Sequence, residues 1–200
     1  MSVAQLLAAL ASPDPTPGGG TAAAIAGAMG GSLLVMVTGL AKSNTNADSE
    51  KAALAEARAR IEPIIGRLMQ LADADTEAFN AVMAAYRLPK ANDDEKAART
   101  RAIQQSLRGA TDVPLETLRA CESAIGDGRV VATHGNRSAA SDVGVAIGLL
   151  KAAGDGAAAN VRINLDGLKD QDYKTAVGRE LGELSAKVAA HCAEAMRALA

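Results

Sequence analysis

The chain has 200 residues, of which 48% are hydrophobic but only 2% aromatic, and its formal net charge at pH 7 is −2. This length suits a single domain, 1–200, while mixed charges and almost no aromatic side chains for base stacking exclude nucleic acid as an expected partner. A core of Ala, Leu, Val, Ile and Met favours an all-α bundle over a sheet.

The N-terminal segment predicts a short helix followed by a turn. Ser2 and Gln5 form a capping box for a helix that runs to Leu10. The segment 15–20, Pro-Thr-Pro-Gly-Gly-Gly, is a turn, and Thr21 is placed to cap the helix that follows. The open N-terminus of that second helix is a natural seat for an anion.

The uncharged, Ala/Gly-rich run 21–41 predicts a central helix. Ala23, Gly27 and Gly31 recur every four residues, so one helical face is nearly bare and a neighbouring helix can approach its backbone closely. The opposite side carries larger residues at helical spacing: Ile25, Met29, Leu33, Met36 and Leu40. A bilayer span takes roughly 20 such residues, but about half of this run is Ala, Gly, Ser or Thr, which insert poorly. We therefore expect no membrane span but a soluble core helix, buried on most sides.

A polar loop at 43–49 separates this helix from a long helical pattern at 50–87. Pro63 is expected to kink or divide the long helix, because proline removes a helical hydrogen bond. A Leu-Pro break follows, and Asn92 or Asp93 caps the next helix.

The second half of the chain also predicts helices. The helix after Asn92 is expected to bend at Pro114 and to end at the Gly-Asp-Gly sequence 126–128. Another apolar helix covers 141–150. The alternation at 161–165 permits a strand, but without a partner strand a helix or irregular chain is favoured. Asp170 caps a last helix that runs to the C-terminus.

Asp75 is the most informative single residue. Leu68, Leu71, Phe79 and Val82 surround it at steps of three and four residues, which places its carboxylate within an apolar stripe. An unpaired buried carboxylate costs several kcal/mol, so a chain keeps one mainly where it is paired or useful. Two interpretations stay open: an Asp paired with an Arg at a bundle seam, or a general base or acid.

Other polar residues are weaker candidates, each with a structural alternative. Asp142 begins an apolar stripe but also suits the first turn of a helix, and Asn136 lies in a turn signal. Lys90 follows a helix end, where a cation is favourable in any case. Asn160 and Asn164 lie one turn apart if their segment is helical, and two amides can bind a heterocycle or each other.

The sequence gives little support for cofactors. Gly18, Gly19 and Gly20 are not followed by Lys-Ser/Thr and do not follow a strand, so no nucleotide is expected. Cys121 and Cys192 lie far apart and only two histidines are present, so neither a disulfide framework nor a metal site is expected. The expected compartment is the cytoplasm.

Six short motifs occur together in one order: Pro15-Thr-Pro-Gly-Gly-Gly-Thr-Ala-Ala-Ala, Asp75-Thr-Glu-Ala-Phe79, Leu88-Pro-Lys90, Ala110-Thr-Asp-Val-Pro-Leu115, Gly135-Asn136 with Ser141-Asp142, and Asn160-Val-Arg-Ile-Asn164. In combination they resemble the cyclodeaminase/cyclohydrolase family. Its members include stand-alone methenyltetrahydrofolate cyclohydrolases and the C-terminal domain of formimidoyltransferase-cyclodeaminase. The resemblance covers nearly the whole chain and implies an all-α, up-and-down bundle, a homodimer, a folate site near the subunit interface, and Asp75 as catalytic residue.

The function implied by this resemblance is hydrolysis of 5,10-methenyltetrahydrofolate to 10-formyltetrahydrofolate, with Asp75 handling the proton of the attacking water. No cofactor beyond the folate is expected. The other expected substrate contacts are Asp142 and Asn136 as orienting partners, Asn160 and Asn164 on polar edges, and Lys90 or the N–H groups after Gly18, Gly19 and Gly20 on the anionic tail.

Two alternatives stay open. The same site could serve a formimidoyltetrahydrofolate cyclodeaminase, which releases ammonia. The stand-alone chain and the resemblance of its 75–90 stretch to stand-alone enzymes favour the cyclohydrolase. A non-catalytic folate-binding helical dimer is the second alternative, although a carboxylate and an anion cradle are more than binding requires.

Overall fold

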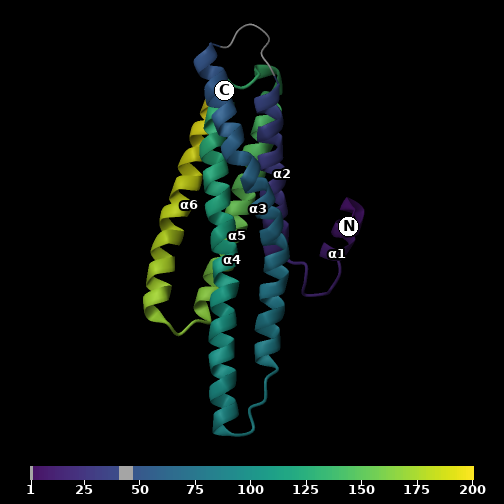
Figure 1. Ribbon diagram of the computed structural model, residues 1–200, viewed down its shortest axis with the longest axis vertical. Helices are drawn as coiled ribbons and strands as arrows, with labels where there is room; N and C mark the ends of the chain where they lie inside the picture. Colours follow the sequence, from purple (N-terminus) through teal and green to yellow (C-terminus); the bar gives the residue numbers. More distant parts are fainter. Residues whose placement is uncertain (1, 41–46) are drawn as a thin grey trace.

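The computed structural model describes residues 2–40 and 47–200, and the regular structure in these ranges is helical (Figure 1). The elements are α1 (Val3–Leu10), α2 (Gly19–Gly39), α3 (Asp48–Tyr86), α4 (Asp93–His134), the short 3₁₀ turn η1 (Arg137–Ala139), α5 (Ala140–Asp166) and α6 (Gln171–Leu199). Helices α2 to α6 run along the long axis, each antiparallel to the one before it, whereas α1 stands apart (Figure 1). The predicted all-α, up-and-down bundle is confirmed.

The helix starts that depend on local capping are those that the sequence predicts. Ser2 and Gln5 form the expected capping box, with hydrogen bonds of 2.7 and 3.2 Å. Asn92 and Asp170 each accept the backbone N–H three residues later, at 2.8 and 3.0 Å. Of the predicted loop 43–49, residues 43–46 lie outside the described residues, and Asp48 already belongs to α3.

A division at Pro63 and a helix end at 126–128, both possible from the sequence, are absent, because packing overrides the local signals, whereas α4 continues beyond Pro114 as expected. Pro63 does not divide α3, because Ile61 and Leu68, which lie on either side of it in the helix, are both fully buried in the bundle. α4 continues through Pro114, and the predicted end at 126–128 is wrong. The ideal Cβ of a residue at Gly128 would lie 2.7 Å from the Ile147 side chain, so this glycine permits close packing on α5 and does not end its helix. The alternating segment 161–165 is also helical and belongs to α5.

The bare face of α2 packs as predicted. Ala23, Gly27 and Gly31 are buried, and the ideal Cβ of Gly27 would lie 3.1 Å from the Cys121 sulfur of α4. Gly30 approaches α5 even more closely, since its ideal Cβ would lie 2.7 Å from the carbonyl oxygen of Ala146. At these glycines the backbone of α2 therefore packs directly against α4 and α5.

α2 is largely buried, as expected, but one of its sides is open. Met29 is 55% exposed, and Met36 and Leu40 are each 42% exposed, because α3, α4 and α5 cover the small-residue face together with Leu34 and Val37 and leave the side of these residues uncovered. With Ile65 and Met69 of α3, this open side forms an apolar groove. Of the described helices, only α2 is long and apolar enough to cross a membrane, and 50% of its apolar window is buried inside the bundle, as in a core helix.

Candidate active site

A pocket opens where the first turn of α2 meets the C-terminal third of α3, Ala110 of α4 and the C-terminal half of α5. Asp75 of α3 and two asparagines of α5 supply polar side chains, and the glycines at 18–20 supply backbone. Phe79 and Val82, one and two turns beyond Asp75, form an apolar wall. The predicted residues that meet here are Gly18, Gly19, Gly20, Asp75, Asn160 and Asn164.

Asp75 presents its carboxylate to this pocket from a half-buried position. The Thr21 hydroxyl donates a hydrogen bond to Oδ2 at 3.0 Å. An ideal Cβ on Gly20 would lie 2.1 Å from Oδ1, so the carboxylate packs on the α2 backbone in space that only a glycine leaves open. No Arg or Lys within residues 2–40 and 47–200 forms an ion pair with Asp75, which removes the seam pairing considered above for this part of the chain.

The prediction that Thr21 caps α2 is wrong. The N-cap is Gly18, which has no side chain to cap the helix, and the helix begins at Gly19. Because the glycines enter the helix, Thr21 lies within the first turn, where it is 6% exposed and its hydroxyl faces α3. Sequence reasoning missed this contact. A signal was present in the sequence, because Thr21 lies three residues before Ala24 and therefore on the same helix face as that buried residue.

Asn164 is held by a carbonyl that a proline leaves free. Pro114 lies inside α4 and has no N–H, so the carbonyl of Ala110, four residues earlier, lacks its helical donor. The side-chain Nδ2 of Asn164 donates to this oxygen at 2.6 Å. The bond fixes the amide at the pocket and leaves its Oδ1 as an acceptor. Asn160 lies one turn earlier on the same helix, so both amides border one pocket.

Three predicted site residues lie elsewhere in the same chain. Lys90 is exposed in the loop between α3 and α4, and α3 extends about 16 Å beyond Asp75 before it ends at Tyr86. Lys90 therefore lies too far away to touch a group bound at Asp75, although a long ligand can span the distance along α3.

Asn136 and Asp142 lie at the opposite end of α2. The ideal Cβ of Gly135 would lie 3.0 Å from Val37, which is close to the end of that helix. From Gly20 to Val37 the helix rises about 26 Å. Asn136 precedes η1 and Asp142 lies in the first turn of α5, so neither residue orients Asp75 within one copy of the chain.

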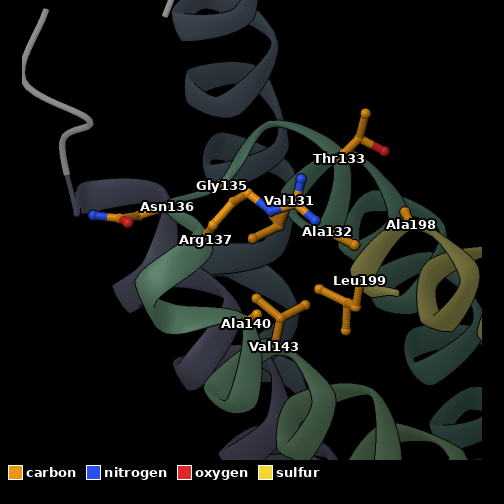
Figure 2. A pocket seen from close by; sticks show the side chains of 10 residues that line it. All are labelled: Val131, Ala132, Thr133, Gly135, Asn136, Arg137, Ala140, Val143, Ala198 and Leu199. Carbon is orange, nitrogen blue, oxygen red and sulfur yellow. The ribbon is translucent and has the colours of Figure 1, made fainter. Parts of the chain in front are cut away.

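Figure 2 shows a second pocket at that end, between the end of α4, η1, the start of α5 and the end of α6. The Asn136 amide points away from it, and its Oδ1 accepts the Ser138 N–H at 3.0 Å, which makes it a local turn contact. Val143 and Leu199 point into the pocket, which is bordered by Arg137. Among the described residues that line this second pocket, Arg137 is the charged one and none is a carboxylate, so no group there could take the part of Asp75.

The fold and the first pocket together define a class of protein. It is an all-α bundle that offers a small, polar-edged ligand one carboxylate, two amides and the N-terminus of a glycine-rich helix. Across the described ranges, no three His, Cys, Asp or Glu side chains gather as metal ligands would.

Residues 2–183 match the model of the family described as Formiminotransferase-cyclodeaminase, and the chain belongs to this family. It is 42% identical to a methenyltetrahydrofolate cyclohydrolase of Methylorubrum extorquens, with 94% of this chain and 91% of that protein covered. It is 32% identical to formimidoyltransferase-cyclodeaminase of Gallus gallus, of which it spans only 29%. The crystal structure of formiminotetrahydrofolate cyclodeaminase from Thermotoga maritima has a TM-score of 0.88 and 27% identity, with 100% of this chain and 96% of that one covered. The resemblance found in the sequence is confirmed.

Proposed function

We propose that this chain is a methenyltetrahydrofolate cyclohydrolase that converts 5,10-methenyltetrahydrofolate to 10-formyltetrahydrofolate in one-carbon metabolism. Its 42% identity over almost the full length of the Methylorubrum enzyme supports this reaction. The observation that carries the proposal is the Asp75 carboxylate, held by Thr21 at one oxygen and set in a pocket with two amides. We also propose a cytoplasmic location, which free and buried Cys121 and Cys192 suit.

The reaction needs a group that accepts and returns a proton. In the substrate, a one-carbon unit bridges N5 and N10 as a delocalised cation. Water attacks that carbon and gives one proton to Asp75, the bond from the carbon to N5 then breaks, and Asp75 returns the proton to N5. The second water proton leaves to solvent as the formyl C=O forms. The carboxylate also lies beside the cation, which favours substrate binding. This scheme balances with water alone and requires no cofactor beyond the folate.

The remaining contacts follow from where the polar groups lie. Asn160 and Asn164 meet the polar edges of the ligand, and Oδ1 of Asn164 is available to accept an N–H. The carboxylate beside Gly20 would repel an anion at the start of α2, so we place the glutamate tail along α3 toward Lys90.

A Lys90→Gln variant is then expected to raise KM several-fold and to leave kcat unchanged. An unchanged KM would remove Lys90 from the site.

The near-ultraviolet absorbance of 5,10-methenyltetrahydrofolate provides the test. The purified chain should accelerate its decay over a blank, and Asp75→Asn should abolish the acceleration while folate binding is retained. Asp73→Asn is the matched control, because Asp73 is an exposed carboxylate on the same helix two residues away. Full activity in Asp75→Asn would contradict the proposed role of this residue.

The Thermotoga structure supports a second candidate reaction, because that protein is named a cyclodeaminase and its fold matches this chain over its whole length. In that reaction N10 attacks a formimino carbon carried on N5, and the proton lost by N10 leaves with ammonia. Asp75 would transfer this proton. Ammonia release from 5-formimidoyltetrahydrofolate, without decay of the methenyl compound, would assign the chain to this activity. Folate binding without turnover of either compound would assign it to a non-catalytic helical dimer.

We further propose that the chain forms a homodimer through the open side of α2. That side combines exposed Met29 and Met36 with apolar residues of α3 in one groove, and large contiguous apolar patches mark association sites. Met29→Asp should give a monomer in light scattering. Met196→Asp is the matched control, because Met196 is 50% exposed but lies on α6, and it should leave the dimer intact.

An antiparallel, two-fold arrangement of this kind would also explain the split in the predicted site. It sets the C-terminal end of one α2, with Asn136 and Asp142 nearby, beside the N-terminal end of the other, where Asp75 lies. Mixing two inactive variants tests it. Subunit exchange between Asp75→Asn and Asp142→Asn dimers should restore activity, because one of the two sites in the mixed dimer is intact. A mixture that stays inactive after exchange would contradict the shared site.

A further inference from the structure

Thr21 differs from the other buried threonines of the described ranges. Three threonines are buried there, and Thr111 and Thr117 each donate a hydrogen bond to the carbonyl four residues earlier in their own helix, at 2.8 and 3.2 Å. That bond is the ordinary way for a helical threonine to satisfy its hydroxyl. Thr21 instead reaches across to α3, more than 50 residues away in the sequence.

The Thr21 hydroxyl lies among three oxygen atoms of α3. Its Oγ1 is 3.0 Å from Oδ2 of Asp75 and 3.3 Å from both the carbonyl oxygen of Ala72 and Oγ1 of Thr76. The hydroxyl has one proton, and the shortest of the three contacts is to the carboxylate, which is also the strongest acceptor. Thr76 can donate to Thr21 in turn, which directs the Thr21 proton toward Asp75.

The two sides of the Asp75 carboxylate are therefore unequal. Oδ2 accepts the Thr21 hydroxyl, whereas Oδ1 packs on the backbone of Gly20 at the pocket lining. An oxygen that already accepts a hydrogen bond is the weaker base of the two. A partial rotation of the carboxylate about its Cβ–Cγ bond would break the hydrogen bond from Thr21 and turn the second oxygen away from its present position, whereas a half-turn would only exchange two equivalent oxygens.

We propose that Thr21 is a positioning residue for the reaction proposed above, on which this inference rests. Its hydroxyl holds Oδ2 of Asp75 so that Oδ1 is the oxygen that faces the substrate and exchanges its proton. Its methyl group only fills space. The hydroxyl and the methyl group can be removed separately, because valine keeps the shape of threonine without the hydroxyl and serine keeps the hydroxyl without the methyl.

The kinetic test compares Thr21→Val, Thr21→Ser and wild type. Thr21→Val should lower kcat about 10- to 100-fold with KM little changed, as expected when a hydrogen bond to a charged group is lost. Thr21→Ser should keep most of the activity. Thr117→Val is the matched control, because it removes the hydroxyl of another buried threonine, and it should keep full activity. A purely structural role predicts the reverse order, with serine harmed by the lost methyl group and valine active, and would overturn the proposal.

A second readout does not depend on activity. Crystal structures of the wild type and of Thr21→Val should show Asp75 in one orientation in the former and rotated or in two conformers in the latter. An unchanged carboxylate in the variant would overturn the positioning role even if the chain turns over neither folate. If instead the wild type is inactive but the rotation is seen, the proposed reaction fails and the role of Thr21 in holding Asp75 stands.

Discussion

Gly30 gives a stability prediction whose size can be worked out from the packing of α2 on α5. An alanine Cβ there would lie 2.7 Å from the Ala146 carbonyl oxygen and 2.8 Å from Leu150 Cγ. Ordinary contact begins at 3.4 Å, so the helices must separate by about 0.7 Å, the difference between 3.4 and 2.7. Backbone cannot move aside as a side chain does. Overpacking of this kind costs about 1 to 3 kcal/mol, against a gain of about 1 kcal/mol in helix propensity.

Gly66→Ala is the matched control for Gly30→Ala. Gly66 is exposed within α3, and its ideal Cβ meets nothing within 4 Å, so alanine there gains the helix propensity without a clash. Urea denaturation should show Gly30→Ala less stable than wild type by up to about 2 kcal/mol and Gly66→Ala more stable by about 1 kcal/mol. If Gly30→Ala were stabilised as much as Gly66→Ala, the close approach of the two helix backbones would be refuted.

Three further predictions concern the site, the buried thiols and the surface charges. Gly20→Ala should displace the Asp75 carboxylate and lower turnover about 100-fold, with the free energy of unfolding little changed; normal turnover would contradict the packing of that carboxylate on α2. Burial raises the pKa of the Cys121 thiol to about 12, so alkylation at pH 8 should follow unfolding, and rapid labelling of the native chain would contradict its burial. The hydrogen bond from Arg119 lowers the pKa of Glu180 from its ordinary 4.5, which contributes stability above pH 4.5 that is lost as the pH falls through the lowered value. Arg119→Gln should therefore reduce stability at pH 7, with a difference from wild type that shrinks in acid; a constant difference would mean that this ion pair is not its source.

The features of the fold that depend on neighbours in the sequence were predictable. The caps at Ser2, Asn92 and Asp170 each use an N–H three residues away, so the pattern and the contact coincide. The helix end at 126–128 was mispredicted, and Pro63 does not divide α3, because the opposing force is packing between helices, which no local pattern contains.

The candidate site also has features that the sequence pattern predicts and others that only the packing of helices reveals. Asp75 was predictable because a charge within an apolar stripe is visible on one helix. The bond from Thr21 to Asp75 joins residues of two helices, and its existence depends on how far the glycines let α2 begin before Thr21. Sequence order also gave no indication that Asn136 and Asp142 lie at the other end of α2 from the pocket, because a motif records order along the chain and not which end of a bundle it reaches.

Pro114 lowers the stability of α4 but helps to position a polar side chain of the pocket. A proline inside a helix costs about 3 kcal/mol relative to alanine, yet α4 retains one where its missing N–H leaves the Ala110 carbonyl to the Asn164 amide. A selection for heat resistance alone would therefore replace Pro114 early, and the restored N–H would compete with Asn164 for the same oxygen. The chain would gain stability, but the Asn164 amide would no longer be fixed at the pocket. Thermostable variants that replace Pro114 should therefore be tested for substrate affinity.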